Sequence, residues 1–148
     1  MSGALANIDP ETGAFLTDCP GREIFDHVTS RWGLLLLLAL VDGPLRFHVL
    51  RDSVEGISEK MLSQNLKILV RDGLVERLVE PTIPPRVSYE LTATGHEVAA
   101  PLNEVLRWIG RRIPDIHAAQ KAYDAEKLAP LPERNTQTFA ATNPEVRS

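Results

Sequence analysis

The chain has 148 residues, a formal net charge of −4 and 43% hydrophobic residues, a composition typical of one folded domain with short tails. Its most apolar run, residues 33–41, has about half the length that a membrane-spanning helix requires, and no signal segment opens the chain. We therefore expect a cytoplasmic protein that does not engage a membrane. The single cysteine, Cys19, excludes an intramolecular disulfide, and the histidines are scattered, so we expect neither a metal site nor a cofactor.

Two helices are predicted near the start of the chain. Residues 23–28 have the spacing of a short helix, with Ile24, Phe25 and Val28 facing inward. A second helix is expected over residues 31–41 and is apolar nearly all round. Such a helix is typically buried at the centre of a domain.

The middle of the chain has the pattern of a helix-turn-helix. Residues 45–46 are expected to form a tiny strand, and residues 47–53 a third helix. A turn at 54–57, which contains glycine, leads into a fourth helix over 58–72. Two helices joined by so short a turn match the helix-turn-helix signature.

A β-hairpin is predicted directly after these helices. Residues 74–79 and 86–91 are rich in strand-forming residues, and a proline-stiffened loop at 80–85 separates them. A helix-turn-helix followed by such a hairpin is a winged helix. The expected fold class is therefore mainly α with a small β-hairpin, a winged helix-turn-helix with terminal dimerisation helices.

The pattern after the hairpin is helical again. Pro101 is expected to kink or restart this helix, and Pro114 to begin a separate segment. We therefore divide the chain into a flexible arm over 1–18, the winged-helix domain with the start of a dimerisation helix over 19–113, a C-terminal helix over 114–128 and a disordered tail over 129–148.

The fourth predicted helix places apolar and cationic side chains on opposite sides. At about 100° of rotation per residue, Leu62, Leu66 and Leu69 form one apolar line. The opposite side carries long hydrogen-bond donors and no acid: Lys60, Gln64, Lys67 and Arg71. Such side chains bind phosphates and reach base edges, which is what a DNA-recognition helix needs. The alternative is an ordinary solvated amphipathic helix.

We predict that this helix and the hairpin bind double-stranded DNA at a pseudo-palindromic operator with half-sites about one helical turn apart. The predicted DNA contacts are Ser58, Lys60, Met61, Ser63, Gln64, Lys67, Arg71 and Arg86. Those in the early turns of the helix would face base edges, whereas Lys67, Arg71 and Arg86 would hold the backbone. Arg86 could instead be an ordinary solvent-facing arginine. The negative net charge argues weakly against nucleic acid, but the local field at the contact surface decides binding.

The terminal helices carry more apolar side chains than a compact winged-helix core needs. The predicted dimer interface consists of Leu102, Leu106, Trp108, Ile109 and Ile113. These side chains could instead cover the helix over 31–41 in the same chain, and they could also serve both purposes. A two-fold homodimer is favoured because a single reading head binds DNA weakly.

Six segments, in order and spacing, resemble the HxlR-type winged-helix regulators of bacteria. They are Cys19-Pro20, Arg31-Trp32 and residues 42–47, 56–62, 72–75 and 84–92. The resemblance covers about residues 19–113 and implies a homodimeric transcription factor. It implies that residues 58–71 enter the major groove, that the hairpin is the wing and that the terminal helices build the dimer. Arg31 departs from the lysine usual in the family, and the tail after Leu128 lies outside the pattern.

The resemblance also draws attention to Cys19, because several family members sense oxidants or electrophiles through the matching cysteine. A helix N-terminus and the nearby Arg22 would favour the thiolate. Asp18 opposes it by like-charge repulsion, and Pro20 removes an amide donor. A sensing thiol and a buried structural thiol both stay open. A sensor could form a bond between subunits, a mixed disulfide or an adduct with an electrophile.

The sequence therefore favours a DNA-binding transcriptional regulator, with a redox or electrophile switch at Cys19 as one version. The alternatives are a regulator that responds to a small-molecule effector and has a structural Cys19, and a winged-helix protein-interaction module that binds no DNA. We predict no enzyme, because the chain has no phosphate-binding loop and no nucleophile elbow. Cys19 and His27 would lie about two helical turns apart, too far for a thiol–imidazole pair.

Overall fold

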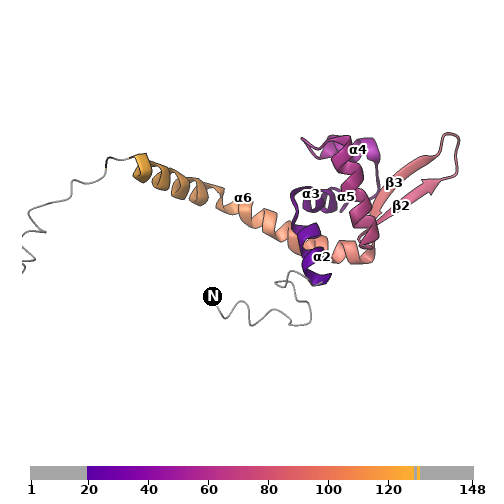
Figure 1. Cartoon of the computed structure of the whole chain (residues 1–148), viewed down its shortest axis with the longest axis horizontal. Helices are drawn as coiled ribbons and strands as arrows, with labels where there is room; N and C mark the ends of the chain where they lie inside the picture. Colours follow the sequence, from indigo (N-terminus) through magenta and orange to yellow (C-terminus); the bar gives the residue numbers. More distant parts are fainter. Residues whose placement is uncertain (1–19, 129, 131–148) are drawn as a thin grey trace, which may run out of the picture. The chain divides into compact units, whose positions relative to one another are not determined.

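The computed structural model describes residues 20–128 and residue 130. Its elements, in chain order, are α2 (Pro20–Thr29), α3 (Arg31–Ala39), β1 (Leu45–Arg46), α4 (Phe47–Ser53), α5 (Glu59–Arg71), β2 (Val75–Glu80), β3 (Arg86–Leu91) and α6 (Ala93–Leu128) (Figure 1). This mainly helical fold with a small sheet confirms the predicted winged helix-turn-helix. None of the helices in residues 20–128 has both the length and the apolar character needed to cross a bilayer.

The chain divides into two compact units within α6, between Trp108 and Ile109. All of the buried core among the described residues belongs to the first unit, between Val28 and Leu102. In the second unit the helix is exposed almost throughout. The two units therefore differ in whether their apolar side chains pack within the chain.

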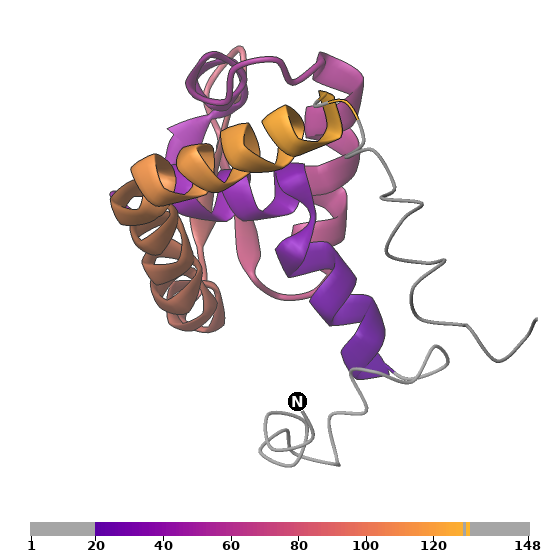
Figure 2. The same cartoon turned by 90° about the vertical axis from the view of Figure 1, so that its left-hand side faces the viewer.

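Helix α3 supplies the centre of this core. It begins after Ser30, whose Oγ accepts a hydrogen bond from the Gly33 N–H at 3.1 Å, and the chain changes direction there (Figure 2). Leu36, Leu37 and Leu40 are fully buried. The prediction of a central apolar helix is confirmed, although α3 ends at Ala39 rather than two residues later.

Helix α2 differs from its predicted packing. Val28 is buried as expected, but Ile24 and Phe25 are each about half exposed, at 48% and 46%. The expectation that both face inward was wrong, because a short helix in contact with α3 along one side can bury only part of its surface.

The turn between α4 and α5 places α5 against the core. Val54 and Ile57 are buried on either side of the turn. Gly56 between them has a φ of +89°, a backbone conformation that side chains with a Cβ rarely adopt. The predicted helix-turn-helix and both of its helix positions are confirmed.

The hairpin belongs to a three-stranded antiparallel sheet in the order β1-β3-β2. Tyr89 of the central strand β3 is paired with both Leu45 and Arg77. Val75 and Leu91, at the base of the hairpin, are buried, whereas its loop end is exposed and projects from the helices (Figure 1). The hairpin is therefore anchored at its base.

Helix α6 continues through both of its internal prolines. The predicted restart at Pro101 and separate helix after Pro114 were wrong. Each proline removes one backbone hydrogen bond, to the carbonyl of Glu97 or of Gly110. Both of these residues are exposed, so water can bind the freed carbonyls and the cost stays local.

The start of α6 packs closely on the chain segment that follows α5. Thr92 donates its Oγ1–H to the Gly73 carbonyl at 2.6 Å and its N–H to the Leu74 carbonyl at 3.1 Å. A Cβ added at Gly95 would lie 2.0 Å from the Leu74 carbonyl oxygen. Only glycine fits this approach without a shift of the backbone.

Candidate nucleic-acid interface

Helix α5 is held from behind by its leucines and capped at its first turn. Leu62, Leu66 and Leu69 are at most 2% exposed. The Ser58 Oγ accepts a hydrogen bond from the Met61 N–H at 3.1 Å, which satisfies one of the free amide groups at the helix start. The orientation of α5 is therefore fixed by packing and by its cap.

The side of α5 opposite the leucines is exposed. It presents Lys60, Met61, Gln64, Lys67 and Arg71. Ser63 is half-buried, and Ser58 is exposed although its oxygen is committed to the cap. Neither Lys60 nor Lys67 forms an ion pair with any side chain in the described part of the chain.

Ion pairs lie at both ends of α5. At the first turn, Arg51 Nη1 of α4 lies 2.5 Å from Glu59 Oε1, and this hydrogen bond, together with the charge of Asp52, raises the pKa of Arg51. At the last turn, Arg71 Nη1 lies 3.1 Å from Glu23 Oε1 of α2. Glu59 is the only acid within α5, so its pairing leaves the exposed side of the helix cationic.

A crevice of about 290 Å³ separates α5 from the hairpin. It is lined by Ser63, Leu66, Lys67, Val70 and Arg71 of α5 and by Arg77 and Tyr89 of the hairpin. Within the described part of the chain, no acid contributes to this lining. Sequence reasoning missed Arg77, although strand alternation could have indicated it. Because Val75 is buried towards the core, Arg77 two residues later shares its side of the sheet.

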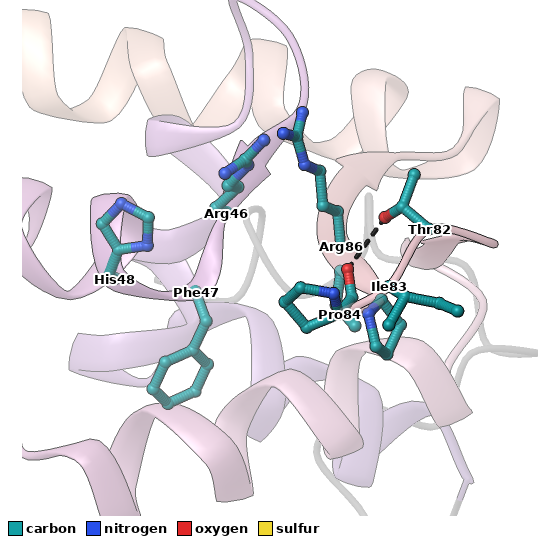
Figure 3. Close-up of a pocket in the computed structure, with 9 residues that line it drawn as sticks. Arg46, Phe47, His48, Thr82, Ile83, Pro84 and Arg86 are labelled. Carbon is teal, nitrogen blue, oxygen red and sulfur yellow. Dashed lines mark hydrogen bonds between the residues drawn. The ribbon is translucent and has the colours of Figure 1, made fainter.

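Arg86 lies elsewhere, at the start of β3. It lines a second crevice, of about 370 Å³, between the hairpin loop and the start of α4 (Figure 3). Arg46 and His48, which sequence reasoning did not single out, line the same crevice. The structure thus brings Lys67 and Arg71 together in one crevice and places Arg86 in another.

Helix α2 contacts the C-terminal end of α5. His27 Nδ1 lies 2.6 Å from Oδ2 of Asp72, the C-cap residue of α5, and both side chains are largely buried. His27 Nε2 also lies 4.0 Å from Glu23 Oε1. Despite this cluster, the part of the chain that the structure describes has no group of three or more histidine, cysteine or acidic side chains suited to a metal ion. Cys19 lies outside the described residues, and α2 begins at the next residue.

The residues predicted for the dimer interface fall into two groups. Leu102 is 8% exposed and belongs to the core of its own chain. The other four lie on α6 with exposed fractions of 36–50%: Leu106, Trp108, Ile109 and Ile113. Only this second group is accessible to a partner.

Comparisons with known proteins agree with this geometry. The model of the HxlR-like helix-turn-helix family matches residues 27–117. The uncharacterised HTH-type transcriptional regulator YtfH of Escherichia coli K12 is 43% identical over 110 residues, which cover 74% of this chain and 87% of YtfH. A solved structure of ytfH from Salmonella typhimurium is 44% identical, with a TM-score of 0.68, and covers 72% of this chain and 96% of that one. The redox regulator HypR in its oxidised form is 30% identical, with a TM-score of 0.58, and covers 63% of this chain and 96% of HypR.

Proposed function

The chain belongs to the HxlR-like helix-turn-helix family of transcriptional regulators, and we propose that it binds double-stranded DNA sequence-specifically as a homodimer. The observation that carries the proposal is the exposed side of α5. It presents Lys60, Gln64 and Lys67, has no unpaired acid within the helix, and is backed by buried leucines. Such a helix can enter a major groove without losing its packing on the core.

We assign base contacts to the early turns of α5 and backbone contacts to its later turns and the hairpin. Lys60 and Gln64 are exposed near the capped end, where recognition helices reach base edges. Lys67 and Arg77 line the crevice between α5 and the hairpin, a place suited to a phosphate-bearing strand. Arg71 already forms an ion pair with Glu23, so we expect it to contribute less to DNA affinity than Lys67 or Arg77.

The homodimer is supported by the exposed apolar side of α6. Leu106, Ile109 and Ile113 follow one another at helical spacing and form one stripe, whereas the exposed Trp108 lies on another side of the helix. We propose that a second copy of the chain covers this stripe. A two-fold dimer presents two copies of α5, so the operator should be two-fold symmetric with half-sites about one helical turn apart.

An electrophoretic shift assay on the DNA upstream of the chain's own gene tests this proposal. At physiological salt we expect binding to this DNA and much weaker binding to a scrambled duplex. Lys60→Ala should relax base preference by about 1–3 kcal/mol, whereas Lys67→Ala should weaken binding to all sequences alike. Equal binding to both duplexes would reject specific recognition. Failure to bind any duplex would favour a protein-interaction module, the reading that the net charge of −4 supports.

We further propose that oxidation or electrophile modification of Cys19 switches DNA binding. Two observations support this: the similarity to the redox regulator HypR, and the contacts of α2 with the end of α5. Because α2 starts one residue after Cys19, a displacement of its start would be transmitted through His27 and Glu23 to Asp72 and Arg71.

The switch is tested by DNA binding of the wild type and Cys19→Ser, each with and without a thiol oxidant. We expect loss of binding only in the oxidised wild type. Identical behaviour of the two proteins under oxidant would remove the switch and leave Cys19 a structural thiol.

A further inference from the structure

Two arginines from separate segments line the crevice between the start of α4 and the hairpin loop (Figure 3). Arg46 is the last residue of β1, and its Cα partner on β3 is Ser88. Arg86 lies two residues before Ser88, so the pleat of the sheet points the side chains of Arg46 and Arg86 to the same face. In Figure 3 both guanidinium groups extend to the same side of the crevice.

The rest of this crevice is mostly apolar, with two further polar side chains, Thr82 and His48. Pro84 and Pro85 form the loop wall, and the Thr82 Oγ1–H donates a hydrogen bond to the Pro84 carbonyl at 2.9 Å. Phe47 and His48 of α4 form the facing wall. The walls therefore offer the two arginines no charge that would neutralise them.

The charges of this crevice are unbalanced. No acid lines it. Glu80 is the Cα partner of Arg86 across the hairpin, yet the described residues contain no ion pair to Arg86 or Arg46. Arg51 and Arg71, by contrast, each contact a carboxylate. Two forked guanidinium groups with no anion suit a ligand with several charged oxygens.

We propose that this crevice is a phosphate site, in which Arg46 and Arg86 clamp one backbone phosphate of the duplex and His48 offers a further donor. This inference deepens the proposed function and rests on it. Arg46 lies on the edge strand of the sheet, outside the helix-turn-helix and the hairpin. The clamp extends the DNA contact beyond α5 and fixes the register of the protein on the duplex without reading sequence.

The salt dependence of DNA binding by the full chain tests the clamp. Each phosphate contact contributes about 0.9 to the slope of log affinity against log salt. We expect Arg46→Gln to lower this slope by about 0.9 per clamp, or about 1.8 for the two clamps of the homodimer, so the affinity advantage of the wild type shrinks about 12-fold between 50 and 200 mM salt. The preference for the operator over scrambled DNA should not change.

Matched variants separate the clamp from a general loss of charge. Arg46→Lys keeps the cation and should retain the slope, with lower affinity because the fork is lost. Arg111→Gln removes the same charge from the exposed surface of α6 and should leave the slope unchanged. Glu80→Gln removes the acid beside Arg86 and should tighten binding. Because Arg46 is exposed, the unfolding midpoint of Arg46→Gln should match that of the wild type.

The outcomes distinguish failure of the clamp from failure of the proposed function. If the wild type shows no preference for its operator, the proposed function fails. If it prefers the operator but Arg46→Gln keeps the wild-type slope, the clamp alone is overturned. A titration of inorganic phosphate into the DNA-free protein tests whether the crevice binds a soluble ligand instead. The arginine Nε–H resonances report this binding by NMR. Arg46-dependent phosphate binding together with an unchanged slope would assign the crevice to a free phosphate compound and contradict the DNA clamp.

Discussion

Helices α5 and α6 are both amphipathic, but they differ in what covers their apolar sides. The leucines of α5 are buried in the core of the chain, and its polar side is left exposed. Beyond Leu102, nearly all of the large apolar side chains of α6 are themselves exposed. An amphipathic pattern thus shows that an apolar side must be covered, but not whether the same chain or a second copy covers it. We propose that the free side of α5 contacts DNA and that the free side of α6 contacts a second copy of the chain.

The largest expected effect is a loss of stability when a leucine on the buried side of α5 is truncated. Leu66→Ala should lower the free energy of unfolding by about 2–5 kcal/mol, because it removes a side chain only 2% exposed and leaves a cavity. Urea denaturation at fixed protein concentration measures this. Lys67→Ala, the next residue on the exposed side, serves as the control and should change stability by less than about 0.5 kcal/mol. Equal effects of the two variants would contradict the assignment of the sides.

A substitution on the exposed apolar side of α6 should weaken self-association but leave folding unchanged. Ile109→Asp places a charge in the proposed dimer stripe and should weaken self-association by about 2 kcal/mol or more, roughly 30-fold in Kd. Analytical ultracentrifugation measures the Kd, and far-UV circular dichroism should show unchanged helix content. The neighbouring Arg111→Ala should leave the Kd unaltered. A dimer that tolerates Ile109→Asp would place the interface elsewhere.

Two glycines of α6 allow its packed start to be compared with its exposed continuation. Gly95→Ala should destabilise by about 1–3 kcal/mol, because its Cβ would lie 2.0 Å from the Leu74 carbonyl oxygen. A Cβ at Gly110 meets nothing within 4 Å, so Gly110→Ala should stabilise the helix by about 0.5–1 kcal/mol. Thermal unfolding of both variants measures whether each substitution lowers or raises the stability of the protein. Similar shifts for both would show that the start of α6 does not pack as described.

The smallest effect concerns the link between α2 and α5. Removing the 2.6 Å contact of His27 with Asp72 should cost about 0.5–1.5 kcal/mol, the net value of a hydrogen bond in a partly buried site. A double-mutant cycle of His27→Gln and Asp72→Asn isolates the coupling energy. Additive single effects would indicate that the two side chains do not stabilise each other.

Features set by one stretch of chain were predictable from the sequence, whereas those set by contacts between elements were not. The Ser58 cap and the buried leucines of α5 follow from local spacing, and the structure has both. Arg46 becomes a neighbour of the hairpin only through strand pairing, which no local pattern contains, whereas the side of β2 that carries Arg77 could have been inferred from strand alternation. Pro101 was misleading because its cost depends on whether water reaches the freed carbonyl, a property of the folded surface.

The most direct test of DNA recognition by α5 is selection of binding sites from a randomised duplex library by the full chain at physiological salt. We expect enrichment of a two-fold symmetric sequence with half-sites about one helical turn apart. The Lys60→Ala variant should lose its preference at particular base positions while it still binds duplex DNA. A pool that stays as random as the input, or a Lys60→Ala variant that selects the same sequence with the same preference, would contradict DNA recognition by α5.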